Sequence, residues 1–301
     1  MIHLAKLLPC TLLALGSAPA FLAVQDPEPP PRPGRIERLE ALVKESPDDV
    51  VLLGRLGRAY LMDARSGETG KIPAMIELFE RARELDPEQD HAFELGFAHM
   101  LELAARTRAG RPDAEQLECL NAALGEVDAG LAKRPADAAL VSMRGMAQVL
   151  KGLIAEDPEL FGPGFAGLDR GVALAPAALH PRLARGFTLM GFPPEAGQNE
   201  KVVDDLEALL LRVGPMRNAQ AAGMLQVFLG DVLLEMGREE LAVVEYGEAL
   251  ELESTAAAEA RSRLQSLEET GAVDPAAIRR FRNNRIQCAS CHGRPATLDG
   301  R

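Results

Sequence analysis

Apolar side chains recur at helical spacing along most of the chain. Leu229 and Leu233 are four residues apart, and Ala242, Tyr246 and Ala249 follow at intervals of four and three. Residues three or four apart share one face of an α-helix, so these positions predict two consecutive helices with buried faces.

Prolines divide this pattern into segments of similar length. Five of them are spaced by 40, 48, 41 and 39 residues, and each interval holds about one helix pair. A proline disfavours helix in the residue before it, so each predicts the end of a helix. Self-similarity at this period is typical of helical repeat proteins. The five are Pro47, Pro87, Pro135, Pro176 and Pro215.

The last interval carries the most specific pattern. Gly230 lets the first helix approach its neighbour closely, and Gly237 is free to form the turn in the left-handed conformation. Ala242 and Ala249 are small where the second helix crosses the first, and Tyr246 fills the gap between units. Here the sequence resembles the tetratricopeptide repeat (TPR) family.

The resemblance covers roughly residues 35–271, strongly at both ends and weakly in the middle. The first unit places Leu56-Gly57 before Phe79 and Ala82, with a lengthened turn around residues 66–70. The middle units show Gly96, Gly145 and Gly186, with longer insertions expected between their helices.

The pattern and the resemblance together predict an all-α fold. We expect a TPR-like superhelical solenoid of about five helical hairpins, a capping helix and a short C-terminal tail at 272–301. The capping helix is predicted at residues 255–269, with Glu259, Arg261, Arg263 and Gln265 on its outer side. Such a stack has a concave face lined by the first helices, which the resemblance implies binds a protein or peptide. A scaffold without a specific groove ligand is the alternative.

The N-terminal segment has the three-part design of a secretory signal peptide. Lys6 precedes the apolar run Leu7–Leu15, and small residues allow cleavage after Ala20 or Ala23. We therefore expect a signal peptide over 1–23 and a location in the periplasm, outside the cell or at its surface; an uncleaved anchor is the alternative. Residues 24–34 contain five prolines and predict an extended linker.

Composition limits the partners. The chain is 47% hydrophobic and 26% charged, which favours a folded domain, and its net charge of −12 argues against nucleic-acid binding. Charged residues interrupt every later apolar stretch, so no membrane-spanning segment is expected in the mature chain.

The sequence Cys288-Ala-Ser-Cys291-His292 is the attachment signature of a c-type haem. Two cysteines three residues apart can reach the two vinyl groups of one porphyrin. The resemblance to c-type cytochromes implies that Cys288 and Cys291 form thioethers to one covalent haem c, with His292 as the proximal iron ligand. A disulfide or redox pair, or a partial zinc site, are the alternatives.

The segment after the motif contains no methionine or histidine, so a second axial ligand would come from the helical body or another molecule, or be absent. The donors in the body are Met224, Met236, His180, His99 and His91. A short basic helix at 274–285 precedes the motif; Arg282 and Arg285, with Arg279 and Arg280, are candidates to pair with haem propionates. They could instead dock the tail on an acidic partner or on the body.

Other motifs favour structural roles. Gly162–Gly167 matches G-x-G-x-x-G but follows no strand, so we expect an irregular loop. Asp204 and Asp205 indicate a solvated helix face, and Cys119 a buried apolar position. No nucleophile, base and oxyanion site assemble, so we expect no enzyme.

The sequence therefore predicts an exported interaction module with one c-type haem, acting in electron transfer or in assembly of a redox complex with a redox partner. The alternative is a haem-free periplasmic scaffold in which Cys288 and Cys291 form a redox or structural pair.

Overall fold

The computed structural model describes residues 34–65, 69–213 and 218–285, and these residues form α-helices and short 3-10 segments with no strand. The all-α prediction is confirmed. The predicted signal peptide, most of the linker and the C-x-x-C-H motif lie outside the described residues. The helices are α1 (Arg35–Glu45), α2 (Val50–Arg65), α3 (Ile72–Leu85), α4 (Ala92–Arg108), α5 (Asp113–Lys133), α6 (Ala138–Ile154), α7 (Phe161–Leu174), α8 (Leu179–Leu189), α9 (Asn199–Val213), α10 (Ala219–Glu235), α11 (Glu239–Leu250), α12 (Ala257–Thr270) and α13 (Pro275–Arg285).

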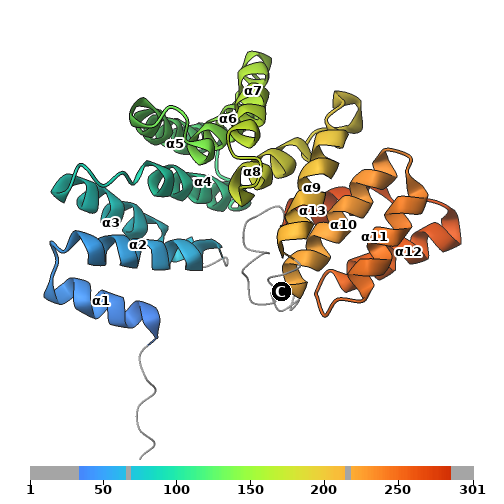
Figure 1. The fold of residues 1–301 in the computed structure, drawn as a ribbon, viewed down its shortest axis with the longest axis horizontal. Helices are drawn as coiled ribbons and strands as arrows, with labels where there is room; N and C mark the ends of the chain where they lie inside the picture. Colours follow the sequence, from blue (N-terminus) through green and yellow to red (C-terminus); the bar gives the residue numbers. More distant parts are fainter. Residues whose placement is uncertain (1–33, 66–68, 214–217, 286–301) are drawn as a thin grey trace, which may run out of the picture. The chain divides into compact units, whose positions relative to one another are not determined.

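Five helical hairpins follow one another in chain order (Figure 1). The pairs α2–α3, α4–α5, α6–α7, α8–α9 and α10–α11 each pack helix against helix, and each pair contacts the next. First helices also meet first helices: α4 touches α2 and α6, and α6 touches α8. Phe187 of α8 meets Phe228 of α10 with ring centroids 5.9 Å apart. This is the predicted repeat architecture, in which each unit buries its apolar face against its neighbours.

The helices end where the prolines predict. α1, α3, α5, α7 and α9 each stop two residues before one of the five prolines. Aspartates then begin two of the next helices: Asp49 accepts hydrogen bonds from the backbone N–H groups of Val51 and Leu52, and Asp137 caps α6 in the same way. A side-chain cap satisfies backbone donors that have no partner inside the helix.

Close approach at glycine is confirmed in the first and last units. A Cβ at Gly230 would lie 2.5 Å from the Tyr246 ring, and one at Gly57 would lie 2.7 Å from the Phe79 ring. Both aromatic side chains are fully buried. Gly237, in the turn after α10, has a φ of +72° and so adopts the left-handed conformation, as predicted.

The middle units differ from the prediction. In the second unit only residues 109–112 separate α4 from α5, so the extra length lengthens the helices, which have 17 and 21 residues, instead of forming an insertion. The connection from α8 to α9 is the long one and contains a 3-10 turn at Pro194–Ala196. Proline spacing reports the repeat length but not where in the repeat the added residues lie.

The expectation of a loop at Gly162–Gly167 is wrong, because this segment forms the first turns of α7. Its glycines let α7 pack closely on α6. A Cβ at Gly145 would lie 2.6 Å from the carbonyl oxygen of Gly164, and one at Gly164 would lie 2.6 Å from Val149. The glycines lie where α7 contacts α6. Packing on α6 stabilises the helix in this segment despite the low helix propensity of glycine.

Candidate functional site

The helix α13 leads directly into the C-x-x-C-H segment, and its apolar side packs on the repeat body. Ile278 and Phe281 are buried. The centroid of the Phe281 ring lies 5.4 Å from that of Phe228 on α10, and the guanidinium of Arg263 on α12 lies over the Phe281 ring, 5.9 Å from its centroid. Ring contacts of this kind add to the free energy gained by burying aromatic surface.

Charged contacts fix α13 in the same place. A guanidinium nitrogen of Arg282 lies 3.0 Å from the carboxylate of Glu235, and the same group donates to the backbone carbonyl of Met190 at 3.5 Å. Arg263 donates to the backbone carbonyl of Ala277 at 3.3 Å. The side chain of Arg282 is only 6% exposed.

Arg282 therefore docks the basic helix on the chain's own body, which is one of the roles predicted for this helix. The Nη1 and Nη2 atoms of Arg282 already contact Met190 and Glu235, and its predicted propionate contact stays a prediction. Arg279 and Arg280 are exposed, and Arg280 makes one 3.6 Å contact with Asp274. The side chain of Arg285 lies outside the described residues, so its predicted propionate contact stays a prediction.

A buried aspartate of α10 joins α11 and α12, and its partner Arg263 also contacts α13. Asp231 of α10 is fully buried and accepts hydrogen bonds from the hydroxyl of Tyr246 at 2.8 Å and from Arg263 Nε at 3.1 Å. Both bonds go to Oδ1, while buried Oδ2 has no hydrogen-bond partner among the described residues, and neither has Nε of Arg282. We call Asp231, Glu235, Tyr246, Arg263 and Arg282 the C-terminal charge network.

The expectation that Arg263 faces outward is wrong, since its side chain is 2% exposed. Burial raises the pKa of the Asp231 carboxyl, and the nearby charges of Arg263 and Arg282 oppose that shift. Burial and the neighbouring Asp231 raise the pKa of the Tyr246 hydroxyl. Tyr246 is therefore a neutral donor to the aspartate.

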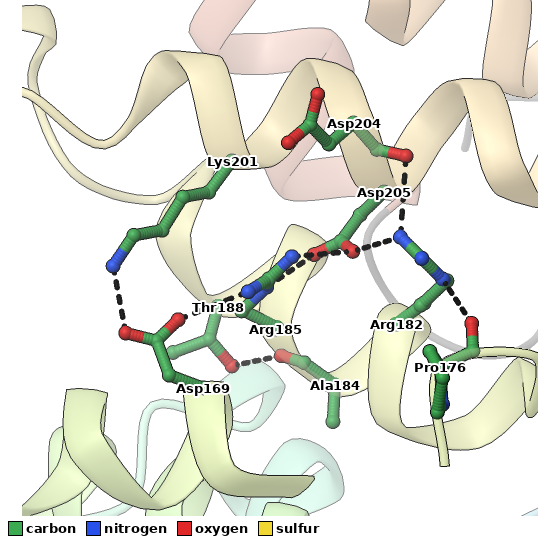
Figure 2. Close-up of polar contacts among 9 residues, drawn as sticks. All are labelled: Asp169, Pro176, Arg182, Ala184, Arg185, Thr188, Lys201, Asp204 and Asp205. Atoms are coloured by element: carbon green, nitrogen blue, oxygen red, sulfur yellow. Dashed lines mark hydrogen bonds and ion pairs between the residues drawn. The ribbon is translucent and has the colours of Figure 1, made fainter. Parts of the chain in front are cut away.

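A second buried network joins α7, α8 and α9 (Figure 2). Asp205 of α9 points between two arginines of α8. Its oxygens lie 3.0 Å from Nη1 of Arg182 and 2.8 and 2.9 Å from Nε and Nη2 of Arg185. Arg185 also pairs with Asp169 of α7 at 3.0 Å, and Lys201 pairs with the other oxygen of Asp169 at 2.7 Å. We call these five residues the central charge network.

The prediction that Asp205 faces solvent is wrong, because this residue is fully buried. The exposed position is its neighbour Asp204, whose carboxylate points away from the network in Figure 2, while its backbone carbonyl accepts from Arg182. Burial raises the pKa of the Asp205 carboxyl and Arg185 acts against it. Since its oxygens accept hydrogen bonds from both arginines, this carboxylate holds α9 against α8 within the hairpin.

The predicted axial donors lie on different helices or helix ends. Met224 and His91 are buried, the latter against the Phe79 ring at 5.3 Å. His180 lies at the start of α8 and forms a T-shaped pair with Phe93 of α4, with ring centroids 4.8 Å apart. Met236 is half-buried and directly follows Glu235, the partner of Arg282.

Within residues 34–65, 69–213 and 218–285, no three His, Cys, Asp or Glu side chains form a group that could hold a metal ion. Cys119 is buried as predicted, and burial raises its thiol pKa to about 11. A thiol in this state is a poor nucleophile.

Both charge networks were missed at the sequence level. A signal for one of them exists, since Asp231 is the single charged residue in the apolar run Val227–Leu234. A charge inside such a run is either buried with a partner or marks the end of the buried face. The partner, Arg263, lies on another helix, and the helix period alone does not identify it.

No protein-family model matches the chain, and no curated protein does. Among solved structures the chain is similar to a thermophilic TPR protein from Thermus thermophilus, with 22% identity, 70% of this chain and 95% of that chain covered, and a TM-score of 0.47. Among the helices described here, none combines the length and apolar character needed to cross a membrane.

Proposed function

We propose that this chain is an exported interaction scaffold that carries one covalent c-type haem beside its last helix and acts in electron transfer or in assembly of a redox complex. The observation that supports this proposal most is that Phe281 and Arg282 anchor the helix before the C-x-x-C-H motif on the repeat body. A tail with only a solvated basic face would not bury these side chains.

The anchor limits where the haem can be. Cys288 follows Arg282 by six residues, and six residues span at most about 20 Å. The haem of this proposal would therefore bind within that reach of the point where Arg282 contacts Met190 and Glu235. A redox group kept at one place on a scaffold can be presented to a partner in a fixed orientation.

In this proposal Cys288 and Cys291 bind the porphyrin and His292 binds the iron. When bound, the haem supplies one-electron redox chemistry. Arg282 and Arg285 remain the propionate candidates, with the exposed Arg279 and Arg280 on the same helix as further ones; Arg282 also pairs with Glu235. The repeat body supplies binding surface, and no residue of it is assigned a catalytic role.

Export and haem attachment support each other, since haem is attached to c-type proteins on the export side of the membrane. The N-terminal pattern predicts that route. Protein partners are expected because stacked helical hairpins present extended binding surfaces.

The test is absorption spectroscopy of the full chain, expressed with its own leader alongside haem-maturation machinery. We expect a Soret band that survives acid–acetone extraction. The double variant Cys288→Ala, Cys291→Ala should be colourless with an unchanged circular dichroism spectrum. A colourless wild-type protein would contradict the haem proposal and favour the haem-free scaffold.

A further inference from the structure

An open groove crosses the outside of the second and third hairpins, and its volume is about 490 Å³. Three helices line it, α6 between α5 and α7. The lining residues are Leu131 of α5 and Pro135 just after that helix, Val141, Arg144 and Gln148 on α6, and Pro163, Ala166, Gly167 and Arg170 on α7. We call this the α5–α7 groove.

The groove follows from the glycine packing of α7. Gly145, Gly164 and Gly167 bring α7 so close to α6 that a Cβ at any of them would lie within 3.1 Å of the facing helix. Toward α5, α7 presents the small side chains of Pro163 and Ala166, which are both exposed. Because these two side chains are small, the space between α5 and α7 stays open beside Val141, and Arg170 follows one helical turn after Ala166.

The charges of the groove are opposite to those of the whole chain. Arg170 is exposed and has no ion-pair or hydrogen-bond partner within the described part of the chain. Arg144 makes one ion pair, with Asp128 at 2.9 Å, and both of those side chains are about half exposed. The lining contains two arginines and no acidic residue, on a chain of net charge −12.

We propose that the α5–α7 groove binds a short extended segment of a partner protein that carries acidic residues among aliphatic ones. This inference rests on the scaffold part of the proposed function and does not depend on the haem. Arg170 and Arg144 pair with the acidic side chains of the segment, and aliphatic side chains lie on Leu131, Val141 and Ala166. Arginine is well suited to this role because its planar donors match a carboxylate.

The openness of the groove favours a chain segment over a small acid. Sites for small molecules bury most of their ligand. Here Pro135, Arg144, Pro163, Ala166 and Arg170 are all exposed. A small carboxylate would remain largely in water and gain little, whereas an extended segment continues beyond the groove and contacts both walls along its length.

The test uses a fluorescein-labelled peptide of alternating glutamate and leucine, titrated into the full chain and followed by fluorescence anisotropy. We expect saturable binding that weakens with salt, and no binding of the same peptide with lysine in place of glutamate. Arg170→Glu should weaken binding about tenfold or more, since hydrogen bonds to charged groups carry that much free energy.

Two further variants separate the groove from general electrostatics. Arg261→Glu changes the same charge on the exposed face of α12 and should leave binding unchanged. Ala166→Leu fills the groove without changing charge and should also weaken binding. Equal binding by wild type and Arg170→Glu, or no binding by wild type, would overturn this inference. A normal haem spectrum in the same sample would show that the proposed haem function stands regardless.

Discussion

The two buried charge networks have the same centre but different surroundings. Asp205 and Asp231 are both fully buried aspartates paired with arginine. Both carboxylate oxygens of Asp205 accept hydrogen bonds from arginines of one neighbouring helix. In Asp231, Oδ1 accepts both hydrogen bonds of the carboxylate, and Oδ2 accepts none among the described residues. The central network is complete within adjacent helices. The C-terminal network is incompletely satisfied and spans the four helices α10–α13.

This difference indicates different roles. The central network closes the α8–α9 hairpin onto α7, so its loss should damage one repeat. The C-terminal network supplies polar contacts between α13 and the body, because Arg282 pairs with Glu235 and Arg263 donates to the carbonyl of Ala277. Incompletely satisfied buried polar groups cost free energy, and they are where a structure can change at lowest cost.

The largest expected effect is from removing either aspartate. Asp231→Ala and Asp205→Ala should each lower the free energy of unfolding by roughly 3–5 kcal/mol, because buried guanidinium donors lose the carboxylate that accepts from them. Asp231→Ala should cause the larger loss of stability, because its partner Arg263 is more deeply buried than Arg185: their side chains are 2% and 11% exposed. Urea denaturation followed by circular dichroism measures both.

The matched control is Asp204→Ala, next to Asp205 but exposed. We expect a change within about 0.5 kcal/mol. An Asp231 variant as mild as this control would show that the C-terminal network does not stabilise the fold.

The next effect tests the glycine contact between α6 and α7. Gly145→Ala places a Cβ 2.6 Å from the carbonyl oxygen of Gly164 and 2.7 Å from the amide nitrogen of Leu168. Backbone atoms cannot rotate away, so we expect a loss of roughly 1–3 kcal/mol in unfolding free energy. Gly247→Ala on α11 meets nothing within 4 Å and should gain up to about 1 kcal/mol from helix propensity. A stabilised Gly145 variant would contradict the close packing.

The repeat could be predicted from the sequence because its signals are local. Proline spacing gave every odd-numbered helix end up to α9, and Gly230, Gly237 and Tyr246 gave the turn and the contact in the last unit. These features depend on residues close in the chain, where helical period and turn chemistry decide the structure.

The parts that could not be predicted depend on distant partners. Arg263 looked like a surface residue of a capping helix, and its burial depends on Asp231, 32 residues earlier. Asp205 and Asp204 look alike in sequence, but only one faces α8. Gly162–Gly167 was assigned to a loop because glycine disfavours helix, and packing on α6 overrides that preference.

A local effect is expected at α13. Arg282→Ala removes the pairing with Glu235 and Met190, so α13 should leave the body more often while the repeats stay folded. Cleavage by chymotrypsin after Phe281 should accelerate several-fold, with little change in the thermal midpoint of the repeats. Arg280→Ala, at a side chain 68% exposed, is the control and should leave cleavage unchanged. Equal cleavage rates of the two variants would show that the Arg282 contacts do not hold α13 on the body.

The smallest effect is a pH dependence from His91. Its ring is buried beside Phe79 and both its nitrogens have no hydrogen-bond partner among the described residues, so burial lowers the pKa of the imidazole. Below the ordinary pKa of about 6.5 the unfolded chain binds the proton more readily than the folded one, so stability falls as pH falls. His91→Leu should lose less stability than wild type between pH 7.5 and pH 5. An identical pH dependence would mean that His91 is protonated as easily in the fold as outside it.

Amide hydrogen exchange across α13 in the full chain tests the central claim most directly. If the C-terminal helix is part of the folded body, the amides of Phe281 and Arg282 should be protected to a degree similar to those of α12, and the Arg282→Ala variant should lose that protection. Exchange of wild-type α13 at the rate of an unfolded peptide would contradict the account, because α13 would then have no fixed place on the repeat body.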